Sequence, residues 1–197
     1  MSHFCGIVFG HENNLDFILA PFDENEQVDE YIYMTADEAL EWAKQRAADL
    51  KERYSDPENP NTYVGETLRE YNNFESEEDL KRYIQNYWET LDDEGNVLST
   101  YNPNSKWDWW VIGGRWSNEL LHQGEDLEDQ APIQECTQID TPFCFIDLDG
   151  NWHESAKMGW WGMTSDDKDE DVWENEFREY LSSVPEDTVL TVIDFHI

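Results

Sequence analysis

Four side chains with metal-binding chemistry lie at the two ends of this sequence. His3 and Cys5 are two residues apart near the N-terminus, and Asp194 and His196 have the same spacing near the C-terminus. Side chains two apart on a strand point to one face, so neighbouring terminal strands would bring all four together. A His–Cys–Asp–His set suits zinc or another borderline metal. The alternative is that the histidines are simply exposed and the cysteine packs as a small hydrophobe.

A second group with chemical potential is the segment KWDWWVIGGRW, residues 106–116. Its arginine is the only Lys or Arg between residues 107 and 156, and an arginine beside two glycines can hold an anion with free backbone N–H groups. Indole rings around it could stack on a base or a sugar. The segment MGWWG (158–162) would form the other wall of this pocket. The predicted ligand-binding residues are Trp107, Trp109, Trp110, Arg115, Trp160 and Trp161.

The same segment also fits a purely structural interpretation, which we favour. An apolar strand buried on both sides, bent at Gly113–Gly114, explains most of its composition. Trp107 and Trp109 would then share one face of the strand with Val111. Arg115 would pair with one of the many carboxylates.

Other catalytic patterns are weak in this sequence. The stretch DLDGNWHE (147–154) departs from a calcium loop because its glycine is fourth rather than sixth, so a hairpin turn is the better interpretation. His153 and Glu154 are neighbours and would point to opposite faces of a strand, which disfavours an acid–base pair. There is no phosphate-binding loop, serine nucleophile elbow or HExxH motif. We therefore expect a binding protein rather than an enzyme, with no cofactor.

The charge of the chain is extreme. Forty-six acidic residues face twelve basic ones, which gives a net charge of −34 and an isoelectric point near 4.1. Such a surface repels nucleic acid and anionic membranes and attracts basic clefts. Solubility and adaptation to high salt are two alternative explanations. The charge nevertheless exceeds what solubility requires.

The third explanation is that the acids form a docking surface for a basic, nucleic-acid-binding protein. In this hypothesis the protein mimics DNA, and its carboxylates take the place of phosphates. The partner would be a host nuclease or another nucleic-acid-binding defence factor, with no direct binding to nucleic acid or membrane. The acids predicted to carry this contact are Asp166, Asp167, Asp169, Glu170, Asp171, Glu125, Asp126, Glu128 and Asp129.

The cysteines and the hydropathy of the chain indicate a compartment. The three cysteines, Cys5, Cys136 and Cys144, are odd in number and lack CxxC spacing, which favours free thiols in a reducing environment. The sequence shows neither a secretory leader nor an apolar run near eighteen residues. We therefore expect a cytoplasmic protein.

The elements that position these residues are predicted from hydrophobic periodicity and capping. Helices are expected over 35–54, 76–91 and 166–181, the first two with N-caps at Thr35 and Ser76. Strands are expected over 3–10, 15–22 and 188–197, with a hairpin over 141–155 that turns at Asp149–Gly150 and an acidic loop over 23–30.

The order of these elements predicts an α+β fold. We expect a mostly antiparallel sheet with about three helices on one face, in a ferredoxin-like (split βαβ) arrangement. The first and last strands should lie inside the sheet because they are the most apolar. The length suits a single domain over 1–197, or one domain with a large excursion, and loops are expected near 55–75 and 123–140.

Three stretches carry a resemblance to a protein family. YNPNSKWDWWVIGGRW (101–116), WHESAKMGWWG (152–162) and LTVIDFHI (190–197) resemble segments of uncharacterised proteins encoded by bacteriophages and some bacteria. The opening SHF and the stretch LAPFDEN (19–25) are also similar. The resemblance implies a phage accessory protein that is expressed in the bacterial cytoplasm. It implies no activity and no catalytic residue.

Overall fold

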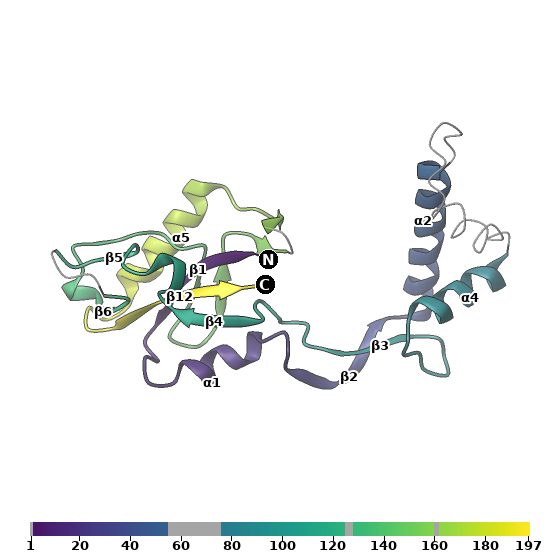
Figure 1. Ribbon diagram of the computed structural model, residues 1–197, viewed down its shortest axis with the longest axis horizontal. Coiled ribbons are helices and arrows are strands. Elements are labelled where there is room, and N and C mark those ends of the chain that lie inside the picture. Colours follow the sequence, from purple (N-terminus) through teal and green to yellow (C-terminus); the bar gives the residue numbers. More distant parts are fainter. Residues whose placement is uncertain (1, 55–75, 125–127, 160–161) are drawn as a thin grey trace. The chain divides into compact units, whose positions relative to one another are not determined.

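The computed structural model describes residues 2–54, 76–124, 128–159 and 162–197 (Figure 1). Within it the chain forms two compact units. Unit 1 contains residues 1–27 and 101–197, and unit 2 contains residues 28–100. The prediction of a single domain over 1–197, or of one domain with a large excursion, stays a prediction.

Unit 1 is built on a six-stranded sheet. The last strand lies next to the first in antiparallel orientation, and the first is parallel to β8 (Cys144–Ile146), while every other pairing given for this sheet is antiparallel. The α+β class and the mostly antiparallel sheet are therefore confirmed, as are the inner positions of the two terminal strands. In order, the strands are β4 (Trp109–Ile112), β12 (Val189–His196), β1 (His3–Phe9), β8 (Cys144–Ile146) and β9 (Trp152–Glu154), and β6 (Gln130–Pro132) also pairs with β12.

Helices cover both faces of this sheet. On one face Phe9 and Val192 pack with Phe177 of α5 (Glu170–Ser183). On the other face Phe195 packs with Leu19 of α1 (Leu15–Leu19). This differs from the expectation of three helices on one face, because the central strands are apolar on both sides and each side must be shielded from water. The ferredoxin-like arrangement stays a prediction.

Two local expectations in the first thirty residues are wrong. Residues 15–22 form α1 and a short 3-10 helix (Ala20–Phe22) instead of a strand. Leu15 and Leu19 are four residues apart and are both buried, which is helical spacing. The supposed loop over 23–30 contains the start of β2 (Gln27–Met34).

Unit 2 contains two helices and a two-stranded sheet. Helices α2 (Ala36–Tyr54) and α4 (Glu77–Tyr87) pack through a small core, and β2 pairs with β3 (Val97–Tyr101). Both predicted N-caps are confirmed: the Glu38 carboxylate accepts from the Thr35 hydroxyl at 2.7 Å, and Ser76 forms a capping box with Asp79.

Short elements complete unit 1. Strands β5 (Leu121–His122) and β7 (Gln138–Ile139) pair with each other and contribute Leu121 and Ile139 to the core that lies under α5. The predicted hairpin is formed by β8 and β9, and helix α5 begins four residues later than predicted. The other short elements are β10 (Lys157–Met158), β11 (Thr164–Ser165) and the 3-10 helices Gly114–Trp116 and Ile133–Glu135. Among the described residues no helix has the length and apolar character needed to cross a membrane.

Candidate functional site

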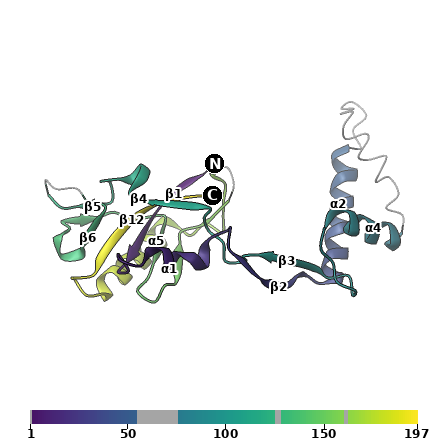
Figure 2. The ribbon, with the colours of Figure 1, turned by 60° about the horizontal axis from the view of Figure 1, so that its bottom comes forward.

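The two ends of the described chain meet at one end of the sheet in unit 1. The register pairs His3 with His196 and Cys5 with Asp194, so the four residues singled out from the sequence lie on one face, as predicted. Figures 1 and 2 show the N- and C-terminal ends of the ribbon side by side. Ser2 and Ile197 exchange two backbone hydrogen bonds of 3.0 Å, which makes the next pair, His3–His196, a non-hydrogen-bonded pair with closely spaced side chains.

Two imidazole–carboxylate pairs form at this end of the sheet. Nδ1 of His3 lies 2.8 Å from Oδ1 of Asp194, and Nδ1 of His196 lies 2.5 Å from Oδ1 of Asp108. The two imidazole rings meet edge to face with centroids 4.9 Å apart, and the Trp109 ring stacks on His196 at 5.0 Å. We call these five residues the terminal cluster. Sequence reasoning missed Asp108, which reaches His196 only because the chain before β4 lies beside β12.

The double glycine positions the carboxylate of Asp194. That side chain is only 3% exposed, and its Oδ2 atom accepts the Arg115 backbone N–H at 3.0 Å. Gly114 has a positive φ of 53°, and a Cβ atom there would lie 2.4 Å from the Asp194 carboxylate oxygen. Only glycine lets the two segments approach so closely.

Gly113 plays the same role for a second carboxylate. A Cβ atom there would lie 2.0 Å from Oδ2 of Asp129. Asp129 accepts hydrogen bonds from the Ser117 hydroxyl and the Asn118 N–H, both at 2.8 Å. The backbone N–H groups of this glycine-containing loop therefore donate to carboxylates of the protein itself. This corrects the prediction that these N–H groups are free to hold an external anion.

The tryptophan segment is less buried than the structural interpretation predicts. Strand β4 lies at the edge of the sheet, and Trp109 is 43% exposed, so a strand buried on both sides is wrong. Trp107 precedes the start of β4 at Trp109, so it is not part of that strand. It is buried in the core that packs against α1, where Trp110 also packs. The Arg115 side chain is exposed and has no ion pair among the described residues. Trp160 and Trp161 lie outside the described residues.

Cys5 contributes a thiol rather than a thiolate to this face. Burial raises the pKa of Cys5, and the nearby charge of Asp194 adds to the effect. Its sulfur accepts the Phe143 N–H at 3.4 Å, and the side chain packs against the α5-side core. Among the described residues, no group of three or more His, Cys, Asp or Glu side chains is arranged to hold a metal ion.

A pair of cavities lies beside the Lys106–Glu154 ion pair. Their volumes are about 240 and 420 Å³, and both are lined by Pro103, Lys106 and Glu154. Nζ of Lys106 lies 2.6 Å from Oε1 of Glu154, and the Trp152 indole donates to Oε2 at 2.9 Å. A hollow therefore exists between Lys106, the first residue of the segment 106–116, and the pair Lys157–Met158. Its central cation is Lys106, not the predicted Arg115.

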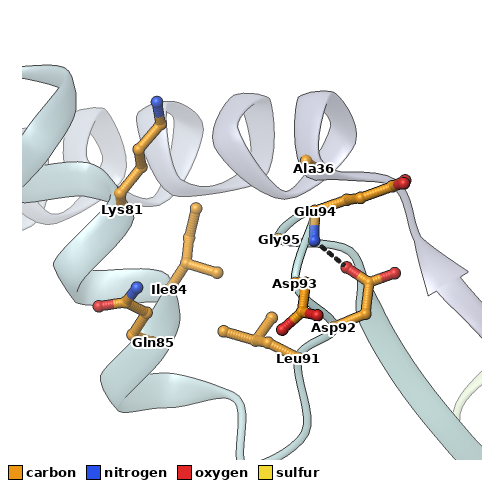
Figure 3. Close-up of a pocket in the computed structure, with 9 residues that line it drawn as sticks. All are labelled: Ala36, Lys81, Ile84, Gln85, Leu91, Asp92, Asp93, Glu94 and Gly95. Atoms are coloured by element: carbon orange, nitrogen blue, oxygen red, sulfur yellow. Dashed lines mark hydrogen bonds between the residues drawn. The ribbon is translucent and has the colours of Figure 1, made fainter.

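Unit 2 has a cavity of about 290 Å³, which Figure 3 shows in close-up. Lys81, Ile84 and Gln85 of α4 line one side, and the turn from Leu91 to Gly95 lines the other. The Asp92 carboxylate is occupied by the N–H groups of Glu94 and Asn96. Hydrogen bonds from Asn96 are the main cause of its lowered pKa, so the turn accounts for its geometry without a ligand.

The β8–β9 turn is the predicted hairpin, not a calcium site. The Asp147 carboxylate accepts from the N–H groups of Asp149 and Asn151, and it contacts Nε2 of His153 at 3.0 Å. His153 and Glu154 have different partners, as predicted from strand alternation, since Glu154 turns to Lys106.

The predicted docking acids fall into three groups: those that are exposed, those that are engaged within the protein, and those outside the described residues. Asp167, Asp169, Glu170 and Asp171 are exposed at the start of α5, and Glu128 is also exposed. Asp166 is exposed but pairs with Lys157 at 2.6 Å, while Asp129 is used by the loop described above. Glu125 and Asp126 lie outside the described residues.

Unit 1 carries most of the negative charge because it holds most of the residues. This unit holds 27 acidic and 5 basic residues, a net charge of −22. Four of those basic residues form ion pairs inside the unit, and only Arg115 has none among the described residues. The unit therefore has almost no free cation to neutralise its exposed acids.

No family model, curated protein or solved structure matches this chain.

Proposed function

We propose that the protein is an acidic accessory protein that docks on a basic, nucleic-acid-binding protein of a bacterial host and mimics DNA. The observation that carries the proposal is the start of α5, where Asp167, Asp169, Glu170 and Asp171 are exposed within five residues. Lys168, the one cation inside this run, is held by Glu176 at 2.7 Å and lies over the Trp173 ring. The four acids thus keep their charge available for a partner.

The resemblance to phage-encoded proteins supplies the biological setting of this proposal. A phage protein that occupies the DNA-binding surface of a host nuclease or related defence factor would protect phage DNA. In this setting it acts in the bacterial cytoplasm, where the three free thiols would persist. Its activity is binding, without catalysis.

The test is a pull-down from bacterial lysate with the wild type and two charge variants. One variant carries Asp167→Asn, Asp169→Asn, Glu170→Gln and Asp171→Asn. The matched control removes the same charge from exposed acids of unit 2, through Asp29→Asn, Glu30→Gln, Asp49→Asn and Glu89→Gln.

The proposal predicts that one basic protein is retained by the wild type and the control and is released by a short DNA duplex. Losing four surface ion pairs weakens binding by about 2 kcal/mol or more, roughly 30-fold. Affinity should also fall steeply as salt rises. Equal binding by both variants, or a complex that DNA does not displace, would refute the proposal.

A small-ligand function is the second candidate, and the cavities at Lys106 favour it. An anionic ligand there would have to displace Glu154 from Lys106, since the ion pair occupies the cation. Lys106→Met would then abolish ligand binding without affecting the pull-down. Arg115→Ala, which the sequence-based prediction chose, should leave this ligand site unchanged.

A further inference from the structure

The terminal cluster contains two imidazoles with one occupied nitrogen each. A carboxylate only accepts hydrogen bonds, so Nδ1 of His3 and Nδ1 of His196 both carry the proton in these contacts. This fixes the tautomer in which each Nε2 has a free lone pair.

Neither Nε2 atom has a hydrogen-bond partner among the described residues, and neither is one of the fully buried polar atoms that lack a partner. The side chains of His3 and His196 are 11% and 6% exposed, so both rings are mostly enclosed. The rings come from directly paired residues of adjacent strands.

We propose that His3 and His196 together bind a divalent transition metal ion of the zinc class through their two Nε2 atoms. Water completes the coordination, since no third side chain is arranged as a ligand among the described residues. The Asp194 and Asp108 carboxylates act as outer-sphere partners that hold the tautomer and the orientation of the two rings. Imidazole favours Zn²⁺, Ni²⁺ and Cu²⁺ over Mg²⁺ and Ca²⁺.

This arrangement differs from the four-ligand site expected from the sequence. Asp194 is turned toward His3 and the Arg115 N–H, and Cys5 is turned toward Phe143. Neither side chain is therefore a ligand. Asp194 acts only through its contact with His3, and Cys5 takes no part in the site. The inference does not depend on the docking function proposed above.

The experiment is calorimetric titration of the protein with Zn²⁺ in millimolar Mg²⁺, which competes with Zn²⁺ for the surface carboxylates. We expect one equivalent of Zn²⁺ to bind. His3→Ala and His196→Ala should each lower the affinity about tenfold or more, because a single imidazole remains, and Asp108→Asn should lower it about tenfold by freeing the ring.

The matched control is His122→Ala. His122 also pairs with a carboxylate, at 2.9 Å from Asp140, but it is placed on β5 away from the terminal strands in sequence and pairing. This variant should bind Zn²⁺ like the wild type. If His3→Ala or His196→Ala fails to fold, nitrogen NMR of the wild type decides, since Zn²⁺ should shift the Nε2 resonances of these two residues.

Two results would overturn the inference. One is Zn²⁺ binding of equal affinity in the wild type and both histidine variants. The other is complete displacement of Zn²⁺ by Mg²⁺ with no change at the two Nε2 resonances, which would assign the binding to surface carboxylates.

Discussion

Among the histidine–aspartate pairs of unit 1, those in the β8–β9 turn and in the terminal cluster use the imidazole differently. In the β8–β9 turn, Nε2 of His153 contacts Asp147, Nδ1 lies 3.6 Å from Glu176, and the ring stacks on Phe145 at 4.4 Å. In the terminal cluster each histidine uses one nitrogen only. An imidazole with both nitrogens and one face occupied is a structural element, whereas one with an open nitrogen keeps its capacity to bind.

The largest effect that separates the two places should come from Asp147→Ala. The change removes the acceptor for two backbone N–H groups, the Asn151 side chain and His153, so it should lower the free energy of unfolding by about 3 kcal/mol. Asp108→Ala is the comparison in the terminal cluster. It removes a single contact of a side chain that is 29% exposed and should cost about 1 kcal/mol or less. Equal losses in urea unfolding would contradict the distinction.

Gly114→Ala should be next in size. A Cβ atom would collide with Asp194, and the backbone has positive φ, so we expect a loss of about 2 kcal/mol together with a disturbed His3–Asp194 contact. Gly124→Ala is the matched control, since Gly124 has a φ of 77° and nothing within 4 Å of the added atom. The difference in thermal stability between the two variants separates the cost of the collision from the cost of the backbone strain. A Gly114 variant as stable as the Gly124 variant would argue against the tight approach to Asp194.

Acid should weaken the turn through Asp147. Burial by itself would raise the pKa of Asp147, but hydrogen bonds from His153 and Asn151 outweigh it and place the pKa below its ordinary value. A lowered folded-state pKa gives stability that is present above the unfolded pKa, near 4, and is lost as pH falls through the folded value. The stability gap between wild type and Asp147→Asn should therefore shrink below about pH 4. A gap independent of pH would contradict this assignment.

The smallest effect is expected at the exposed pair of His122 and Asp140. Their side chains are 37% and 45% exposed, and such pairs contribute little. His122→Ala should change the free energy of unfolding by less than about 0.5 kcal/mol in chemical denaturation. A loss above 1 kcal/mol would mean that exposure is a poor guide to the role of these imidazoles.

The elements that the sequence predicted well are those with local signals. The N-caps of α2 and α4 depend on residues three apart, and the β8–β9 turn on Asp149–Gly150, so no tertiary information was needed. Helix α1 was missed because five residues give too short a period to separate a helix from a strand. Strand β2 was missed because its acidic residues resemble a loop.

The candidate site was predictable only where spacing and strand order sufficed. The shared face of His3, Cys5, Asp194 and His196 followed from placing the terminal strands together. The contact of Asp108 with His196 and the close approach of Asp194 to Gly114 both depend on the pairing of β4 with β12. That pairing joins distant parts of the sequence and gives no local sequence signal. The same holds for the Lys106–Glu154 ion pair, whose members are 48 residues apart.

The backbone exchange between Ser2 and Ile197 has a practical consequence for handling the protein. Both of these residues are one position away from the paired imidazoles, so an affinity tag of consecutive histidines fused at either end would bring competing ligands to the same place. Purification with a cleavable, histidine-free tag avoids this artefact.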